Sequence, residues 1–138
     1  MGAWNHGPFD NDDASDFLYA LEESSQPLLL LQESLTAAAS CATYLEVPEG
    51  SAAIASAAVV ATSWSGRVQS VSDDLSARIS KLGLARDVIA PLVPLASAAL
   101  TRVSQENSEL LELWTEAGEA EPWLSSLSDI QGGFAEIA

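Results

Sequence analysis

The sequence predicts an all-α protein, a compact bundle of six or seven short helices with an irregular N-terminal arm. Apolar residues recur at helical spacing along most of the chain. No run alternates apolar and polar residues between turn-forming residues, as a half-buried strand would. Proline and glycine lie mainly where the periodic segments begin and end, which is where helices tolerate them.

The length and composition predict one domain that spans residues 1–138. The chain is 48% apolar, and a chain of this length buries roughly two thirds of its unfolded surface on folding. It therefore needs neither a disulfide nor a metal for stability, and no linker rich in proline, serine or glycine divides it. Residues 1–10 form the arm, where Pro8 disfavours a helix. Trp4 and Phe9 supply apolar side chains that we expect to pack on the bundle.

The first two helices have recognisable starts. Asn11-Asp12-Asp13 offers an N-cap side chain and acidic charge for the positive end of the helix dipole, and Asp13 with Asp16 resembles a capping box. We expect this helix to end near residues 24–25. Pro27 then suits the first turn of a second helix, whose apolar period continues to about Leu45.

The third helix is expected to be the buried centre of the domain. It opens at Pro48 and ends at Gly66, and residues 52–61 are apolar almost all round the helix. A helix without a polar face is usually enclosed by other elements. Its alanines and serines also allow neighbouring backbones to approach closely.

The later helices are predicted from the same caps and breakers. Asn107-Ser108 either interrupts a long helix and caps a new one or is passed through, and both alternatives stay open. The other expected elements are a helix capped at Ser72 and stopped by Gly83, a short joint over residues 86–90, a helix with Pro91 and Pro94 in its first turn, a helix over residues 109–117, and a last helix from Pro122 to Gly132-Gly133.

Charge is distributed unevenly along a chain whose formal net charge is −15. Residues 1–50 carry nine acids and no base, residues 51–103 carry three acids and five bases, and residues 104–138 carry eight acids and no base. Phosphate backbones are bound through lysine and arginine, so we expect no nucleic-acid partner. A basic protein partner suits the acidic ends, because complementary fields speed encounter. The simpler explanation is a solvated surface that keeps the protein soluble.

The first hypothesis for function is a non-enzymatic acidic module that captures a basic protein partner, as an immunity or adaptor protein would. The acidic face is expected to be one of two sets, with one aromatic anchor: Asp10, Asp12, Asp13 and Asp16, or Glu109, Glu112, Glu116 and Glu119, with Trp123 as the anchor. We expect no cofactor. A further hypothesis is a structural subunit of a homo-oligomer that buries Trp123, Phe134 and Ile137, and the sequence leaves the oligomeric state open.

The remaining hypothesis is a metal-dependent enzyme or metal-binding module that uses Asp10–Asp13. The calcium-loop pattern fails there, because Ala14 and Ser15 take the third ligand position and the glycine position. His6 and Cys41 are the only histidine and cysteine, which is too few for a zinc site. Cys41 is expected to be a small buried hydrophobe. With no nucleophile elbow and no phosphate loop, we expect a protein that is not an enzyme.

The termini and the apolar runs predict a cytoplasmic protein. The first residues lack the basic start and apolar core of a signal peptide. The longest apolar stretch, residues 88–100, is broken by Pro91 and Pro94 and is shorter than the roughly 20 residues of a membrane span. We therefore expect no membrane contact.

Two blocks of the sequence resemble a bacterial family of unknown function that is numbered 4259. The first block is Gly2-Ala3-Trp4 with Gly7-Pro8-Phe9-Asp10-Asn11-Asp12-Asp13-Ala14, and the second is Asn107-Ser108-Glu109-Leu110 with Leu113-Trp114. Asn5 stands where the family usually has glycine. The family's helix at residues 52–61 often holds a glutamate, which small residues replace here, so any chemistry of that glutamate is expected to be missing. The resemblance implies a small bacterial helical domain and supplies no activity.

Overall fold

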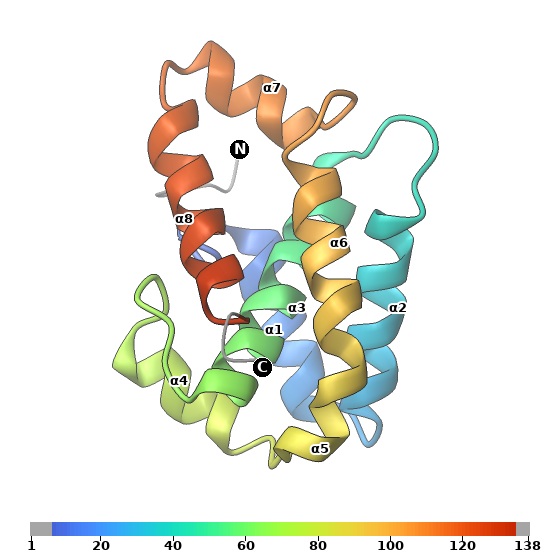
Figure 1. Cartoon of the computed structure of the whole chain (residues 1–138), viewed down its shortest axis with the longest axis vertical. Coiled ribbons are helices and arrows are strands. Elements are labelled where there is room, and N and C mark those ends of the chain that lie inside the picture. Colours follow the sequence, from blue (N-terminus) through green and yellow to red (C-terminus); the bar gives the residue numbers. More distant parts are fainter. Residues whose placement is uncertain (1–6, 135–138) are drawn as a thin grey trace.

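The computed structural model describes residues 7–134, which form an all-α bundle (Figure 1). Seven of the helices in this range have eight or more residues, as the sequence predicts, and one has four. The elements are α1 (Asp12–Glu23), α2 (Pro27–Ala39), α3 (Val47–Ser65), α4 (Asp73–Ser80), α5 (Arg86–Ile89), a 3₁₀ turn (Ala90–Leu92), α6 (Val93–Val103), α7 (Glu109–Glu116) and α8 (Ala120–Gly132). The predicted features at Trp4, His6 and Ile137 lie outside the described residues.

Helix α3 is the centre of the bundle. It contacts each of the other seven α-helices, and every residue from Ala53 to Thr62 is buried. The predicted role of the alanine-rich helix is therefore confirmed. Its small side chains let α2 and α6 pack close against it, and one polar contact at the α2 interface joins the hydroxyls of Ser34 and Ser56.

The buried side chains form one contiguous cluster. Phe9 is 5% exposed and belongs to this cluster, so the described end of the arm packs on the bundle. Trp123 and Phe134 also belong to it, at 3% and 7% exposure. These two side chains are covered by the chain itself.

The structure corrects the predicted end of the second helix. Helix α2 ends at Ala39 rather than near Leu45, and the hydroxyl and amide of Ser40 both donate to the carbonyl oxygen of Thr36. Residues 40–46 form a loop instead. Leu45 is nevertheless buried, because its side chain belongs to the core cluster, and a backbone bridge joins it to Ser108.

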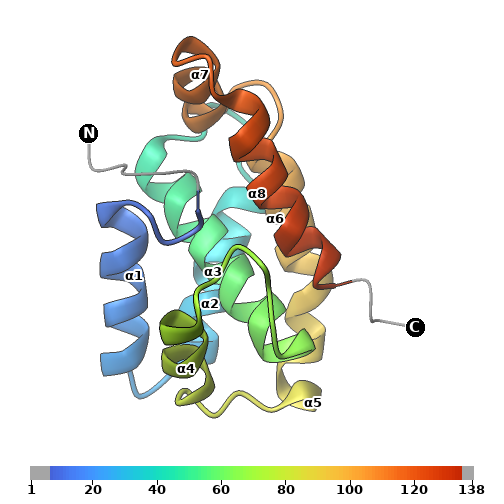
Figure 2. The same ribbon diagram turned by 90° about the vertical axis from the view of Figure 1, so that its left-hand side faces the viewer.

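Different helices lie at the two ends of the bundle. Helix α7 lies at one end, and α4 and α5 lie at the other (Figures 1 and 2). Figure 2 shows α1 on one side of α3, and α6 and α8 on the opposite side. None of the helices within residues 7–134 is long and apolar enough to cross a membrane.

Candidate functional site

The turn between α6 and α7 ends one helix and caps the next. Asn107 has φ of 65°, in the left-handed region that asparagine tolerates better than most residues. Ser108 follows with extended backbone and is 1% exposed, and its Oγ accepts a hydrogen bond from the Leu111 amide at 3.5 Å. Of the two alternatives for Asn107-Ser108, the interruption with a new N-cap is therefore confirmed.

This turn is joined to the loop that follows α2. The Leu45 amide donates to the Asn107 carbonyl oxygen at 2.8 Å, and the Glu109 amide donates to the Leu45 carbonyl oxygen at 2.9 Å. The two bonds make a short parallel bridge between Leu45 and Ser108. The start of α7 is thereby fixed to the segment that leads into α3.

Arg102, near the end of α6, holds both segments through backbone carbonyls. Its Nε donates to Cys41 at 3.0 Å, and its Nη2 donates to Thr43 at 2.8 Å and to Asn107 at 3.2 Å. Its Nη1 donates to Glu106 at 3.3 Å. A planar guanidinium with five N–H donors suits such a cluster of acceptors. The charge of Arg102 is thus directed at loop carbonyl oxygens.

Two of the predicted acidic residues make specific contacts here. Oε1 of Glu109 accepts from the Val47 amide at 2.9 Å, so a side chain of α7 caps the N-terminus of α3. Oε1 of Glu112 accepts from the Tyr44 hydroxyl at 2.7 Å. This hydrogen bond, helped by some burial and by the charges of Glu112, Glu109 and Glu46, raises the pKa of Tyr44 to about 12.

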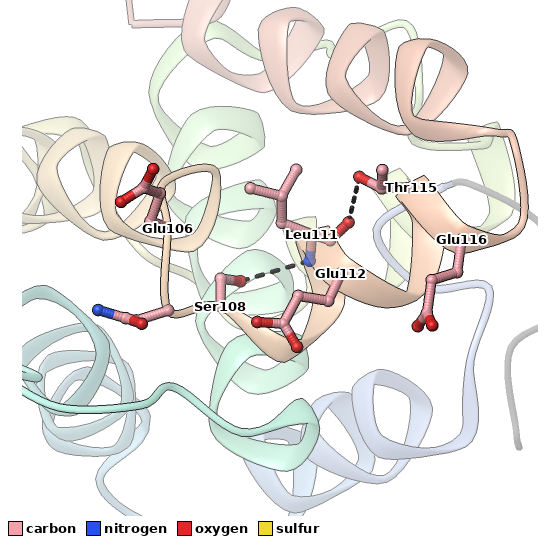
Figure 3. Close-up of a pocket in the computed structure, with 7 residues that line it drawn as sticks. Glu106, Ser108, Leu111, Glu112, Thr115 and Glu116 are labelled. Carbon is pink, nitrogen blue, oxygen red and sulfur yellow. Dashed lines mark hydrogen bonds between the residues drawn. The ribbon is translucent and has the colours of Figure 1, made fainter.

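An open groove lies along α7 and the turn before it (Figure 3). Its volume is about 600 Å³, and its lining residues are Glu106, Asn107, Ser108, Leu111, Glu112, Thr115 and Glu116. Figure 3 shows Leu111 and Thr115 projecting to one edge of α7, while Glu112 and Glu116, one turn apart, project to the other. The groove therefore combines three carboxylates with one apolar side chain.

Every ionisable side chain that lines this groove is acidic. Arg102 is bonded to the Glu106 and Asn107 carbonyls as described above. The other four bases of the chain, Arg67, Arg78, Lys81 and Arg86, lie within residues 66–89. That segment includes α4 and α5, at the opposite end of the bundle (Figure 1). The α7 end is thus the acidic end among the described residues.

The other predicted acidic set, Asp10, Asp12, Asp13 and Asp16, lies at the start of α1. Asn11 is the N-cap, and its Oδ1 accepts from the Ala14 amide at 2.8 Å. The proposed Asp13–Asp16 capping box is therefore wrong, because Ala14 occupies the third helical position. Asp12, Asp13 and Asp16 are exposed, and Asp10 accepts from the Gly7 amide at 3.0 Å.

The last two residues predicted for the binding face, Glu119 and Trp123, differ in exposure. Glu119, in the turn before α8, is exposed. Trp123 is 3% exposed and packs in the core, so its side chain cannot serve as an exposed anchor. Among residues 7–134, an exposed aromatic residue at this end is instead Tyr44, at 42%. Sequence analysis missed Tyr44, because it lies in a loop that the apolar period assigned to a helix.

The structure does not support the predicted metal site, and it places Cys41 only partly in the core. Within residues 7–134, no group of three or more His, Cys, Asp or Glu side chains could hold a metal ion. This range includes the Asp10–Asp13 cluster, whereas His6 lies outside it. Cys41 is partly rather than fully buried, and its Sγ lies 3.9 Å from Nη2 of Arg102. The expectation of a small buried Cys41 is therefore met only in part: the side chain packs against the core but is partly exposed, because its loop lies at the surface of the bundle.

Comparison with known proteins identifies the family. The model of the family described as "Domain of unknown function (DUF4259)" matches residues 2–126. The match covers most of the chain, so the chain belongs to this family. No curated protein and no solved structure matches it.

Proposed function

We propose that this member of the DUF4259 family is a non-enzymatic acidic module that binds a basic segment of a partner protein in the groove along α7. One observation carries the proposal: Glu106, Glu112 and Glu116 line a single groove of about 600 Å³ in which every ionisable side chain is acidic. An immunity or adaptor role belongs to the same proposal, because both require the capture of another protein.

The groove offers each part of a lysine or arginine side chain a suitable contact. Charge-assisted hydrogen bonds from the cation to Glu112 or Glu116 would supply most of the attraction. The aliphatic stem of the cation can pack on Leu111. Tyr44 stands beside the groove, since its hydroxyl is bonded to Glu112, and its exposed ring adds a face for a cation.

The segments that line the groove are held in place by contacts within the chain itself. The Leu45–Ser108 bridge and the Arg102 hydrogen bonds fix the turn on one side, and Glu109 ties α7 to the start of α3. A preformed site loses less conformational entropy on binding than a flexible one. This favours the α7 set of acids over the α1 set, whose Asp12, Asp13 and Asp16 project from one exposed helical end.

Two triple variants test the proposal with a matched change in charge. Glu106→Gln, Glu112→Gln and Glu116→Gln neutralise the groove, and Asp12→Asn, Asp13→Asn and Asp16→Asn remove the same number of charges from α1. The probe is a fluorescent octa-arginine peptide, titrated by anisotropy at several salt concentrations. Three partly exposed ion pairs of about 0.5 kcal/mol each predict a loss of about tenfold for the groove variant.

The outcomes of this comparison separate specific binding from general attraction. The α1 variant is expected to bind within about twofold of the parent, and the affinity of the parent should fall with salt. Equal losses in both variants would mean that net charge alone attracts the peptide. A larger loss of affinity in the α1 variant would show that the peptide binds at the start of α1 instead.

The other two hypotheses have weaker support from residues 7–134. The Asp10–Asp13 carboxylates form no cluster there that could hold a metal. The Trp123 and Phe134 side chains proposed for a homo-oligomer interface are covered by their own chain. The binding module is therefore the function that the geometry supports best.

A further inference from the structure

Tyr44 stands at the edge of the α7 groove as an exposed aromatic side chain. It is 42% exposed, and its hydroxyl donates at 2.7 Å to Oε1 of Glu112, one of the residues that line the groove. The next residue, Leu45, is buried and is joined to Ser108 by the backbone bridge. The ring of Tyr44 is therefore attached to an anchored segment and lies beside the Glu112 carboxylate.

The Glu112 carboxylate keeps an oxygen for a ligand. Tyr44 donates to its Oε1, and no hydrogen bond from residues 7–134 reaches its Oε2. The ion pairs within this range are Arg67–Asp73 and Arg78–Glu22, so neither Glu112 nor Glu116 has a cationic partner there. Glu116 projects to the same edge of α7 one turn later (Figure 3), at a Cβ separation of about 5–6 Å. One ligand cation can therefore contact both carboxylates.

An aromatic ring beside a carboxylate suits a guanidinium better than an ammonium. A guanidinium is planar, so it can lie flat on the ring while its N–H groups donate to oxygens in its own plane. An ammonium is a compact and strongly hydrated point charge without a flat face. The chain itself contains such a double contact. Cζ of Arg86 lies 4.0 Å from the centre of the Trp64 ring, and its Nε donates to the Trp64 carbonyl oxygen at 2.8 Å.

We infer that the α7 groove selects arginine over lysine in the basic segment of its partner. This inference rests on the proposed function and adds the residue type that the groove recognises. The guanidinium lies on the ring of Tyr44 and donates to Oε2 of Glu112 and to the Glu116 carboxylate. A lysine keeps the attraction of the two carboxylates, but it lacks the flat contact and the in-plane donors.

Octa-arginine and octa-lysine peptides with the same fluorophore have equal formal charge at neutral pH and test this selection. Each is titrated by anisotropy into the parent protein, Tyr44→Leu and Tyr44→Phe. The parent should bind octa-arginine about fivefold more tightly than octa-lysine, the gain expected from one stacked cation with an added charge-assisted bond. Tyr44→Leu removes the ring and should lower this ratio to about twofold, whereas Tyr44→Phe keeps the ring and should keep the ratio.

Tyr19→Leu is the matched control, because Tyr19 is also exposed, at 63%, but lies on α1. It should leave the ratio unchanged. Each ratio compares two peptides on the same protein, so partial unfolding of a variant would weaken both peptides without changing the ratio. A ratio that is the same in the parent and in Tyr44→Leu, or a parent ratio near one, would overturn the selection of arginine.

The triple variant Glu106→Gln, Glu112→Gln and Glu116→Gln separates this result from the proposed function. If it weakens both peptides while the parent shows no preference, the groove binds basic segments but does not select arginine. If it binds both peptides as tightly as the parent does, or if the parent binds neither peptide, the proposed function and the selection of arginine both fail.

Discussion

Arg102→Lys is the substitution that most directly tests how the α7 groove is held. It keeps the positive charge and most of the aliphatic stem, but it replaces the planar guanidinium with a single ammonium. Arg102 donates to four backbone carbonyl oxygens, at distances from 2.8 to 3.3 Å. A lysine in the same place can reach at most part of this set, so the loop after α2 and the turn before α7 lose shared donors.

The expected loss follows from the exposure of these contacts. The bond to Cys41 is partly buried, whereas those to Thr43, Glu106 and Asn107 lie at the surface, where water can replace them. Counting about 1 kcal/mol for the buried bond and about 0.5 kcal/mol for each of the others, and allowing lysine to retain one weak bond, Arg102→Lys should lower the free energy of unfolding by about 2 kcal/mol. In a chain of this size, the melting temperature should fall by about 6–8 °C.

Urea unfolding followed by circular dichroism measures this change, with Arg67→Lys as the control. Arg67 pairs with Asp73 at 3.4 Å, but the two side chains are 80% and 89% exposed. Its replacement should therefore change the free energy of unfolding by less than about 0.5 kcal/mol. If both variants unfold within about 0.5 kcal/mol of each other, the guanidinium of Arg102 does not hold the loops and the explanation given for the groove walls fails.

Three further substitutions are expected to have measurable effects. Thr62→Val should raise the free energy of unfolding by about 1 kcal/mol, because it replaces an unpaired buried hydroxyl with a methyl group; a decrease in urea unfolding would show that water already satisfies the hydroxyl. Arg78 lowers the pKa of Glu22 by its hydrogen bond, so Arg78→Met should lower the melting temperature near neutral pH, and this difference should vanish as the pH falls through the lowered pKa of Glu22. A difference that persisted in acid would refute this. Glu112→Ala should return the pKa of Tyr44 from about 12 toward its ordinary value of 10, as ultraviolet titration would show. Because that pKa is raised, the Tyr44–Glu112 bond stabilises the fold below about pH 10 and is lost as the pH rises through 12.

The charges of the chain are distributed unevenly between the two ends of α3, and this arrangement has a physical basis. The N-terminal end of α3 is capped by the carboxylate of Glu109, and other α7 carboxylates surround the groove there. Four of the five bases, Arg67, Arg78, Lys81 and Arg86, belong to the segment that follows the C-terminal end of α3. Acids near a helix N-terminus and bases near a C-terminus both complement the helix dipole. The uneven charge of the sequence is therefore also a pattern along the central helix.

The sequence by itself determined the features that depend on neighbouring residues. Residues 52–61 are apolar almost all round the helix, and such a surface is buried on every side only at the centre of a bundle. Ser72 caps α4 by accepting from the Leu75 amide, and Gly66 and Gly83 take left-handed conformations after α3 and α4. The cap and the two turns are each set within about four residues, and the burial of the helix is set by its own ten residues, so the pattern of residue types is enough to predict them.

Only the tertiary structure decided the features of the candidate site. The Arg102–Cys41, Val47–Glu109 and Tyr44–Glu112 contacts join residues 61, 62 and 68 positions apart. No local pattern indicates that α2 stops at Ala39 so that its loop can meet the start of α7, or that Trp123 faces the core rather than a partner. The acidic content of residues 104–138 was evident from the sequence. The packing of α7 across the end of α3 gathered three of those acids into one groove, because it fixed the directions in which their side chains project.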